Sequence, residues 1–322
     1  MGWARAGRAE HGAPQRPPLA PPVQERAARV EATLLRQALG AATALRRALA
    51  DAGESVESGA VACANPPPPL GGLAAAVGGA GGAAPTAAPP ATPSSATLAS
   101  LTPLFAHRHG HALAVRPSSI PGAGDGVFAV RGIPAGALAA LYPGTAYSPL
   151  QVRAMPGYPR VDAASDYLVA RYDGVILDAG AWGRPGGARR RPRPAGAPPA
   201  AGAAAEAEAD LQSLDARHPL ALGHVANHPP EGTPPNVALA AFDVPPSALG
   251  ADPGLRPFIP VLPVGGPGAR APSAGVPCLG LVALTAVADG GELLLNYRLS
   301  SRLARPGWYA PVDDDEDARR WA

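Results

Sequence analysis

Short apolar runs separated by turn-forming residues dominate the chain from about residue 104 to residue 300. Apolar runs of about four to eight residues that are bounded by Gly, Pro, Asn or Asp are typical of β-strands. On this basis strands are expected at residues 111–116, 126–130, 137–142, 236–244 and 278–287. Because few helical repeats interrupt them, the pattern predicts a mainly β domain with a few helices.

Glycine-containing turns mark a further strand pair and one more strand. The stretch DYLVARYDGVILDAG places Asp173-Gly174 between two apolar runs, which predicts a tight hairpin with a two-residue primed turn. The stretch ADGGELLLNY predicts a turn followed by a strand that ends at Tyr297.

A helical repeat of apolar positions occurs only near the N-terminus, over residues 23–52. The apolar face consists of Val30, Leu34, Ala38, Leu45 and Leu49. Two prolines precede this stretch and a glycine follows it, as is common at helix ends. The favoured interpretation is an amphipathic helix that docks on its own domain, and the alternative is a segment that binds a protein partner. At the other end of the chain, VDDDEDARRW predicts a short helix that caps the domain.

The composition limits how much of the chain can fold. Of 322 residues, 42 are Pro and 39 are Gly, and only 5% are aromatic. Long runs of Ala, Pro and Gly cannot bury enough side-chain surface to offset their ordering entropy, so they are expected to be disordered. The predicted organisation is a disordered tail at 1–22, the helix at 23–52, a low-complexity linker at 53–103, a folded domain at 104–300 with a low-complexity insertion at 183–210, and a cap segment at 301–322.

Charge and cysteine content exclude several functional classes. The net charge is +2 and no lysine occurs, so the basic surface expected of a nucleic-acid-binding protein is absent. No apolar run is long enough to predict a membrane span. The two cysteines, Cys63 and Cys278, form neither a disulfide framework nor a zinc pattern. A cytoplasmic or nuclear location is expected, although the arginine-rich N-terminus leaves organelle targeting open.

A glycine-rich motif, PGAGDGVFAV, precedes the second expected strand. Its glycines, Gly122, Gly124 and Gly126, alternate as in a dinucleotide-binding fingerprint. A dinucleotide-binding loop opens a helix, however, whereas here a strand-like run follows, which excludes that fold. Two interpretations stay open: close approach of the backbone to a ligand, or a tight turn.

Two groups of histidines could suggest a metal site. His224 and His228 have the spacing of HExxH zinc proteases, but valine stands where the catalytic glutamate is needed, and two prolines follow. His107, His109 and His111 would point along one side of an extended segment. A solvated leader to the first strand is preferred for these three, so no metal is expected.

Five segments in order resemble the SET-domain methyltransferase family. They are Gly124-Asp125-Gly126 before VFA, the strand end LYPGT, the hairpin from Tyr167 to Asp178-Ala179, the stretch from Asn227-His228 to Pro235-Asn236, and Gly291-Glu292-Leu293 leading to Tyr297. Within the family, LYPGTAYSP, HPLALGHVANH and AAFDVP resemble the subgroup of SET domain-containing protein 9.

The resemblance implies a SET fold of small β-sheets in which the C-terminal strand passes beneath a loop to form a pseudoknot. It also implies an S-adenosylmethionine-dependent methyltransferase that modifies a lysine side chain of a protein substrate. Tyr297 would be the catalytic residue. The cofactor would be bound by Gly124, Asp125, Gly126, Tyr167, Asn227, His228 and Trp308.

Methyl transfer to an amine is an in-line displacement, for which alignment and exclusion of water matter most. A phenol such as Tyr297 can hydrogen-bond the amine and place its oxygen beside the polarised methyl group.

Some residues depart from the family pattern, mostly on the substrate side. The stretch from Asn227 to Asn236 is three residues longer than usual and lacks the motif cysteine. No cysteine cluster follows Tyr297, so residues 301–322, with Trp308, are expected to fold over the site instead. Leu295 replaces a common aromatic residue. Two alternatives therefore stay open: a catalytically silent SET module that acts as a protein-interaction scaffold, and a methyltransferase whose acceptor is not lysine.

Overall fold

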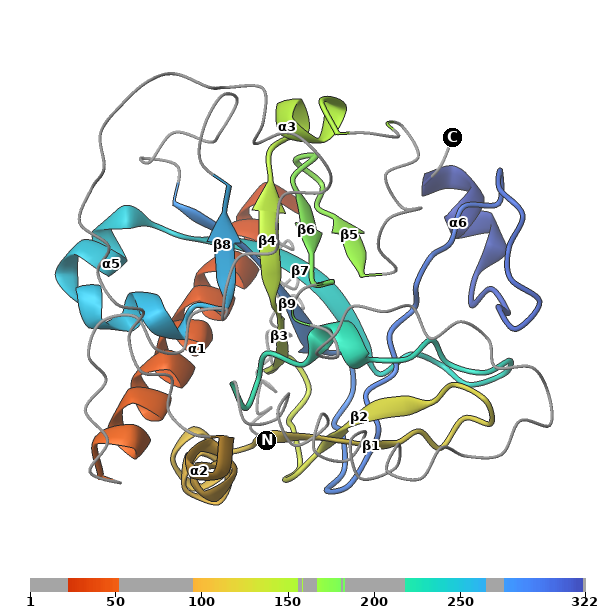
Figure 1. Cartoon of the computed structure of the whole chain (residues 1–322). Coiled ribbons are helices and arrows are strands. Elements are labelled where there is room, and N and C mark those ends of the chain that lie inside the picture. The colour runs from red at the N-terminus through yellow and green to blue at the C-terminus, as the bar shows by residue number, and fades with distance from the viewer. Residues whose placement is uncertain are drawn as a thin grey trace, which may run out of the picture.

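The computed structural model describes residues 23–51, 95–155, 158, 167–180, 182, 218–264 and 275–320 (Figure 1). The described part is a mixed fold of helices and three small, largely antiparallel sheets. The expected disorder of residues 1–22 and 183–210 and of most of the linker concerns residues outside this part. Of the described helices, none is long and apolar enough to span a membrane.

The central sheet has the strand order β3-β9-β7 and is antiparallel. Its strands are β3 (Leu138–Tyr142), β7 (Val237–Val244) and β9 (Val276–Ala283). The middle strand, β9, is almost entirely buried, as the apolar run from Cys278 requires. All three lie where the apolar runs predict strands.

The described residues also form a two-stranded and a four-stranded sheet. The first pairs β1 (Leu113–Pro117) with β2 (Asp125–Ala129), with the glycine-rich motif in the turn between them. The second has the order β5-β6-β4-β8 and consists of β4 (Gly144–Tyr147), β5 (Leu168–Ala170), β6 (Ile176–Asp178) and β8 (Val261–Pro263). The β4–β8 pair is parallel. The remaining elements are α3 (Pro149–Arg153), η3 (Gly223–Val225), α5 (Pro246–Ala251), η4 (Pro253–Phe258) and α6 (Asp314–Arg320).

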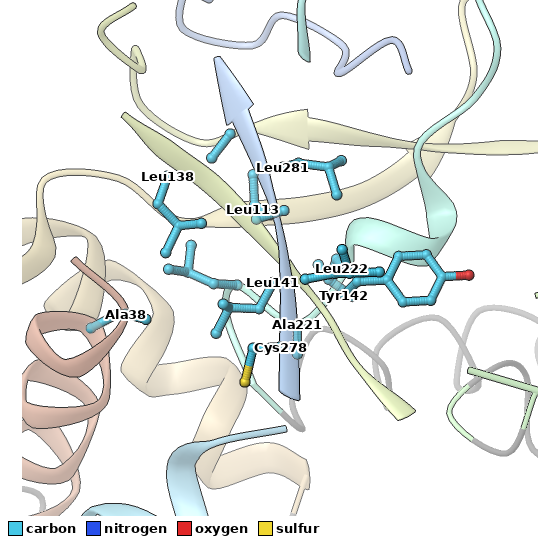
Figure 2. Close-up of a cluster of buried hydrophobic side chains, with 14 of the residues drawn as sticks. Ala38, Leu113, Leu138, Leu141, Tyr142, Ala221, Leu222, Cys278 and Leu281 are labelled. Carbon is cyan, nitrogen blue, oxygen red and sulfur yellow. The ribbon is translucent and has the colours of Figure 1, made fainter. Parts of the chain in front are cut away.

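Helix α1 (Val23–Asp51) is part of the domain rather than an appendage. It packs against β3, β7, η4 and α2 (Ser95–His109). Its apolar side chains Leu34, Ala38, Leu45 and Leu49 are buried, and Figure 2 shows Ala38 facing the cluster that contains Leu141 and Cys278. The first turns extend past this contact, so Val30 is 50% exposed. The structure therefore agrees with the interpretation of a helix docked on its own domain.

Three local expectations differ from the structure. Helix α2 begins at Ser95 and contains Pro103, so it crosses the expected start of the domain at residue 104. His107 and His109 lie in its last turn rather than in an extended segment, and His111 is buried rather than solvated. The stretch before Tyr297 forms isolated bridges instead of a continuous strand, because successive residues pair with different neighbours.

The hairpin between β5 and β6 is present, but its turn differs from the expected type. The N–H of Gly174 donates to Arg171 O at 3.1 Å, and the N–H of Arg171 donates to Val175 O at 2.8 Å. The loop therefore has three residues. Gly174 alone among them has a positive φ, of 78°, whereas a primed two-residue turn would require one at Asp173 as well. Asp173 instead uses its carboxylate to accept from the N–H of Val175 and from the guanidinium of Arg171.

Candidate functional site

The segment that leads to Tyr297 is hydrogen-bonded to both ends of the loop from Asn227 to Asn236. At one end of the loop, the N–H of Leu295 donates to Asn227 O at 2.8 Å. At the other end, the side chain of Asn236 accepts from the N–H of Leu294 at 2.8 Å and donates to Glu292 O at 2.7 Å. Both ends of the loop are thus bonded to the C-terminal segment.

Tyr297 lies against the Asn227-His228 stretch, 69 positions away in the sequence. Its backbone N–H donates to Nδ1 of His228 at 3.2 Å, and its hydroxyl donates to Ala226 O at 3.0 Å. Tyr297 as a whole is 38% exposed. Burial is the main cause that raises the pKa of Tyr297 to about 12, and Tyr167 raises it further, whereas a hydrogen bond between the phenol and the backbone of His228 lowers it. The phenol is therefore protonated at neutral pH.

The hydrogen bonds of its two ring nitrogens fix the tautomer of His228. Since Nδ1 accepts from the N–H of Tyr297, Nε2 carries the proton and donates to Ala310 O at 2.7 Å. The imidazole is stacked on Tyr309 with a centroid distance of 4.4 Å. This residue thus links the Tyr297 segment to the segment that follows it.

An aromatic cluster surrounds the exposed side of Tyr297. The rings of Trp308 and Tyr297 meet edge to face at a centroid distance of 6.2 Å, and Trp308 is 64% exposed. Edge-to-face contacts of this kind are favourable, yet they leave most of the indole surface open. Trp308 therefore presents an exposed indole ring beside Tyr297.

Tyr167 lies near Tyr142 of β3 and near Tyr297. Its carbonyl accepts the hydroxyl of Tyr142 at 2.8 Å, and its ring meets His224 edge to face at 5.7 Å. Figure 2 shows the hydroxyl of Tyr142 pointing away from the aliphatic cluster that the rest of its ring borders. Burial is the main cause that raises the pKa of the Tyr142 phenol, and Asp178, Tyr297 and Tyr167 are close enough to raise it further.

The two glycines that flank Asp125 serve different purposes. Gly124 has a φ of 79°, and no atom lies within 4 Å of where its side chain would be, so its backbone faces open space. Gly126 has ordinary backbone angles, but a Cβ there would lie 2.9 Å from Cδ of Glu292 and 3.2 Å from Nδ2 of Asn227. The carbonyl of Asp125 accepts from Nδ2 of Asn227 at 2.9 Å.

Glu292 connects these parts, and sequence reasoning gave it no role beyond its motif. Its carboxylate accepts from Oγ of Ser118 at 2.7 Å, from N–H and Oγ of Ser119 at 2.9 and 2.5 Å, and from Nδ2 of Asn227 at 3.2 Å. Burial acts to raise the pKa of Glu292, but the bonds from Ser119, Ser118 and Asn227 outweigh it and lower the pKa. A lone acidic residue before the apolar run LLL was the only sequence signal for it.

The segment after Tyr297 folds back against the site. The hydroxyl of Tyr309 accepts from the N–H of Leu299 at 3.1 Å and donates to Asp317 of α6 at 3.0 Å. Arg305 donates to Asp314 at 2.6 Å and to Leu299 O. These bonds tie the described part of the expected cap, residues 301–320, to the segment that carries Tyr297.

The other histidines that the structure describes are His107, His109, His111, His218 and His224. Among the described residues, no group of three or more His, Cys, Asp and Glu side chains is placed to hold a metal ion. His109 is stacked on Phe105 at 5.1 Å and contacts His111. Burial is the main cause that lowers the pKa of His109 to about 4, with smaller contributions from His111 and His218. His109 and His111 thus lie where α2 ends and just before β1 begins.

The structure thus brings together the glycine motif, Asn227, His228, Tyr167, Trp308 and Tyr297, the residues that the sequence singled out. No protein-family model matches the sequence, and a search of the curated proteins finds no match. The chemistry of the site therefore has to be inferred from its own geometry and from the motif order in the sequence.

Proposed function

We propose that this chain is an S-adenosylmethionine-dependent protein methyltransferase of the SET type, with a lysine side chain as acceptor. The observation that carries the proposal is the hydrogen bonding of Tyr297 to His228 and Ala226, which joins two motif segments about 70 positions apart in the sequence. The closure of the loop from Asn227 to Asn236 around residues 292–295 supports the same fold, since a SET domain requires the C-terminal segment to pass beneath this loop.

The residues present have the chemistry to hold this cofactor. Gly124 offers an open backbone in a left-handed conformation, Asn227 offers an amide oxygen, and Trp308 offers an exposed indole for an adenine ring. Tyr167 lies near enough to Tyr297 to border the same space. When bound, S-adenosylmethionine supplies an activated methyl group on its sulfonium.

Tyr297 acts in this proposal as an oriented acceptor rather than as a base. Its hydroxyl proton is hydrogen-bonded to Ala226 O, so the oxygen can act as an acceptor for an amine N–H or a polarised methyl C–H. A phenol whose pKa is about 12 does not remove a proton at neutral pH. The acceptor amine must therefore arrive neutral, and the residue contributes alignment.

The substrate side of the proposal rests on the cap. Trp308 and Tyr309 pack around His228 and border Tyr297, and they would take the place of a zinc-bound cysteine cluster in lining a channel for the acceptor side chain. A protein substrate entering there would exclude water from Tyr297, which favours displacement over hydrolysis. We place the enzyme in the cytoplasm or nucleus, in keeping with its cysteine content.

Transfer of labelled methyl groups to an array of proteins tests this function. The wild type is expected to label lysine in at least one protein, and Tyr297→Phe is expected to reduce the rate about a hundredfold or more. Tyr172→Phe is the matched control and should retain full activity, because this tyrosine is 78% exposed in the β5–β6 turn and its hydroxyl is directed at Glu31 of α1. A wild type that binds cofactor but labels nothing would favour the silent interaction module, and labelling of another residue type would refute the lysine assignment.

A further inference from the structure

Glu292 is a nearly buried carboxylate with a set of neutral partners. Its relative exposure is 9%, and among the described residues its four hydrogen bonds come from Ser118, Ser119 and Asn227, with no arginine contributing. A buried carboxylate without a cation is costly unless several donors satisfy it. Four donors converging on one side chain therefore indicate a position where an ionised acceptor is needed.

The bonds to Ser118 and Ser119 fix the loop that carries the glycine motif. The N–H of Ser118 donates to Gly124 O at 2.8 Å, and the N–H of Ile120 donates to Oγ of Ser118 at 3.1 Å. The start and the end of this loop are thereby closed on each other. Since Glu292 holds the start, it also determines where the open backbone at Gly124 lies.

The bond to Asn227 fixes the direction of its amide group. Nδ2 donates both to Asp125 O and to Oε1 of Glu292, so both of its protons are committed to oxygen acceptors. An amide turned the other way would set its oxygen against a carbonyl and a carboxylate. Oδ1 must therefore point elsewhere, and within the described residues no donor reaches it.

An oriented amide oxygen next to an ionised carboxylate favours a cationic donor. In the proposed cofactor, the group of that chemistry is the α-ammonium of its amino-acid part. The carboxylate of Glu292 does not need to contact the ligand. Because it lies close to Asn227, its negative charge still strengthens the preference of this position for a cation.

We propose that Glu292 is a positioning residue of this site, which fixes Asn227 so that Oδ1 receives an ammonium group and which holds the loop of Gly124 in the matching place. The inference rests on the proposed function, since it assigns the part of the cofactor that this corner of the site binds. Gly126 completes the arrangement, because any side chain there would displace both Glu292 and Asn227.

Calorimetry with S-adenosylhomocysteine and with its analogue that lacks the α-amino group tests the inference. Wild-type protein is expected to bind the analogue about tenfold more weakly, the effect of one hydrogen bond to a charged group. In Glu292→Gln the amide can point either of its ends at Asn227, so binding of S-adenosylhomocysteine should weaken about tenfold and the difference between the two ligands should shrink to about threefold or less. Asp289→Asn, an exposed site three positions earlier, should behave as wild type.

Two outcomes would overturn the inference: a Glu292→Gln protein that still prefers S-adenosylhomocysteine as strongly as wild type does, or one that loses affinity for both ligands equally, as a purely structural residue would. Should that variant fail to fold, Ser119→Ala replaces it, because it removes one hydroxyl donor and keeps the backbone bond to the carboxylate. In Ser119→Ala the ratio of the two ligand affinities should lie between the wild-type ratio of about tenfold and about threefold. An unchanged ratio would contradict the role of Glu292. Failure of the wild type to bind either ligand would instead refute the proposed function.

Discussion

Glu292 fills the space beside Gly126 that a side chain at that position would need. A Cβ on Gly126 would lie 2.9 Å from Cδ of Glu292 and nearer still to its Oε1. The contact joins β2 to the C-terminal segment and explains why a glycine stands there although its backbone angles suit any residue.

Gly126→Ala should therefore disturb both folding and the site. The methyl group would push the carboxylate off its donors, and we expect a loss of about 1–3 kcal/mol in the free energy of unfolding. Denaturant titration measures this. Gly132→Ala is the control, since the nearest atom to its added Cβ is at 3.5 Å, and an equal loss in both variants would contradict the steric explanation.

Arg171 is expected to be among the residues most needed for stability. Its side chain is 2% exposed, donates to Phe242 O and Cys278 O at the β7–β9 pair, and forms ion pairs with Asp173 and Asp243. Arg171→Met would remove these hydrogen bonds and both ion pairs, so a loss of about 3 kcal/mol or more is expected in urea unfolding. Arg29→Met, on the exposed part of α1, should change stability by less than about 0.5 kcal/mol. Comparable losses for the two would show that Arg171 is not a structural centre.

Stability should fall in mildly acidic solution because of His218. This side chain is completely enclosed, its Nδ1 accepts from the N–H of Leu220, and burial lowers its pKa from 6.5 to about 4. The unfolded chain therefore takes up the proton first. The stabilisation is complete above pH 6.5 and is lost as the pH falls toward 4, by up to about 3 kcal/mol.

The unfolding free energy at pH 7 and pH 4.5 gives the measurement. His218→Gln is expected to show a smaller difference between the two pH values than the wild type, while His107→Gln, at an exposed position on α2, should show the same difference. Identical pH dependence in all three proteins would exclude His218 as the cause.

Helix α1 should be required for the domain to fold. Leu45 is fully buried against the core, so Leu45→Ala is expected to cost about 2–5 kcal/mol. Val30→Ala, on the exposed first turns, should cost less than about 0.5 kcal/mol. Thermal unfolding compares them. If α1 were instead a partner-binding appendage, Leu45→Ala would leave the melting temperature of the isolated chain unchanged.

The sequence located the elements whose signal is local. The apolar runs predicted β3, β7 and β9, and the helical repeat predicted α1. These signals are local, because the spacing of apolar residues follows from which side chains of a strand or helix are buried. The Asp173-Gly174 pair located a hairpin but not its turn. Arg171 and Val175 decided the turn, since the buried guanidinium draws Asp173 into a conformation that a primed turn does not allow.

Features that depend on distant neighbours were not predictable. The parallel β4–β8 pair joins strands of three and four residues, too short to show a period. Helix α2 has a low-complexity start and an internal proline, which conceal it. The role of Glu292 in connecting two loops could not be predicted, because its partners Ser118 and Asn227 lie 174 and 65 positions away in the sequence. Motif order did select Tyr297 and Asn227, which the fold then brings together.

Binding of S-adenosylmethionine to the purified chain, measured by calorimetry, tests the proposed function most directly. We predict one site per chain, and at least a tenfold loss of affinity in Asn227→Ala with the folded state preserved, because the amide is held between the glycine motif and Glu292. Asn296→Ala, one position before Tyr297, serves as the control for the loss of an amide and should bind the cofactor with wild-type affinity. A folded wild type that gives no binding heat and no shift of its melting temperature with the cofactor would contradict the assignment.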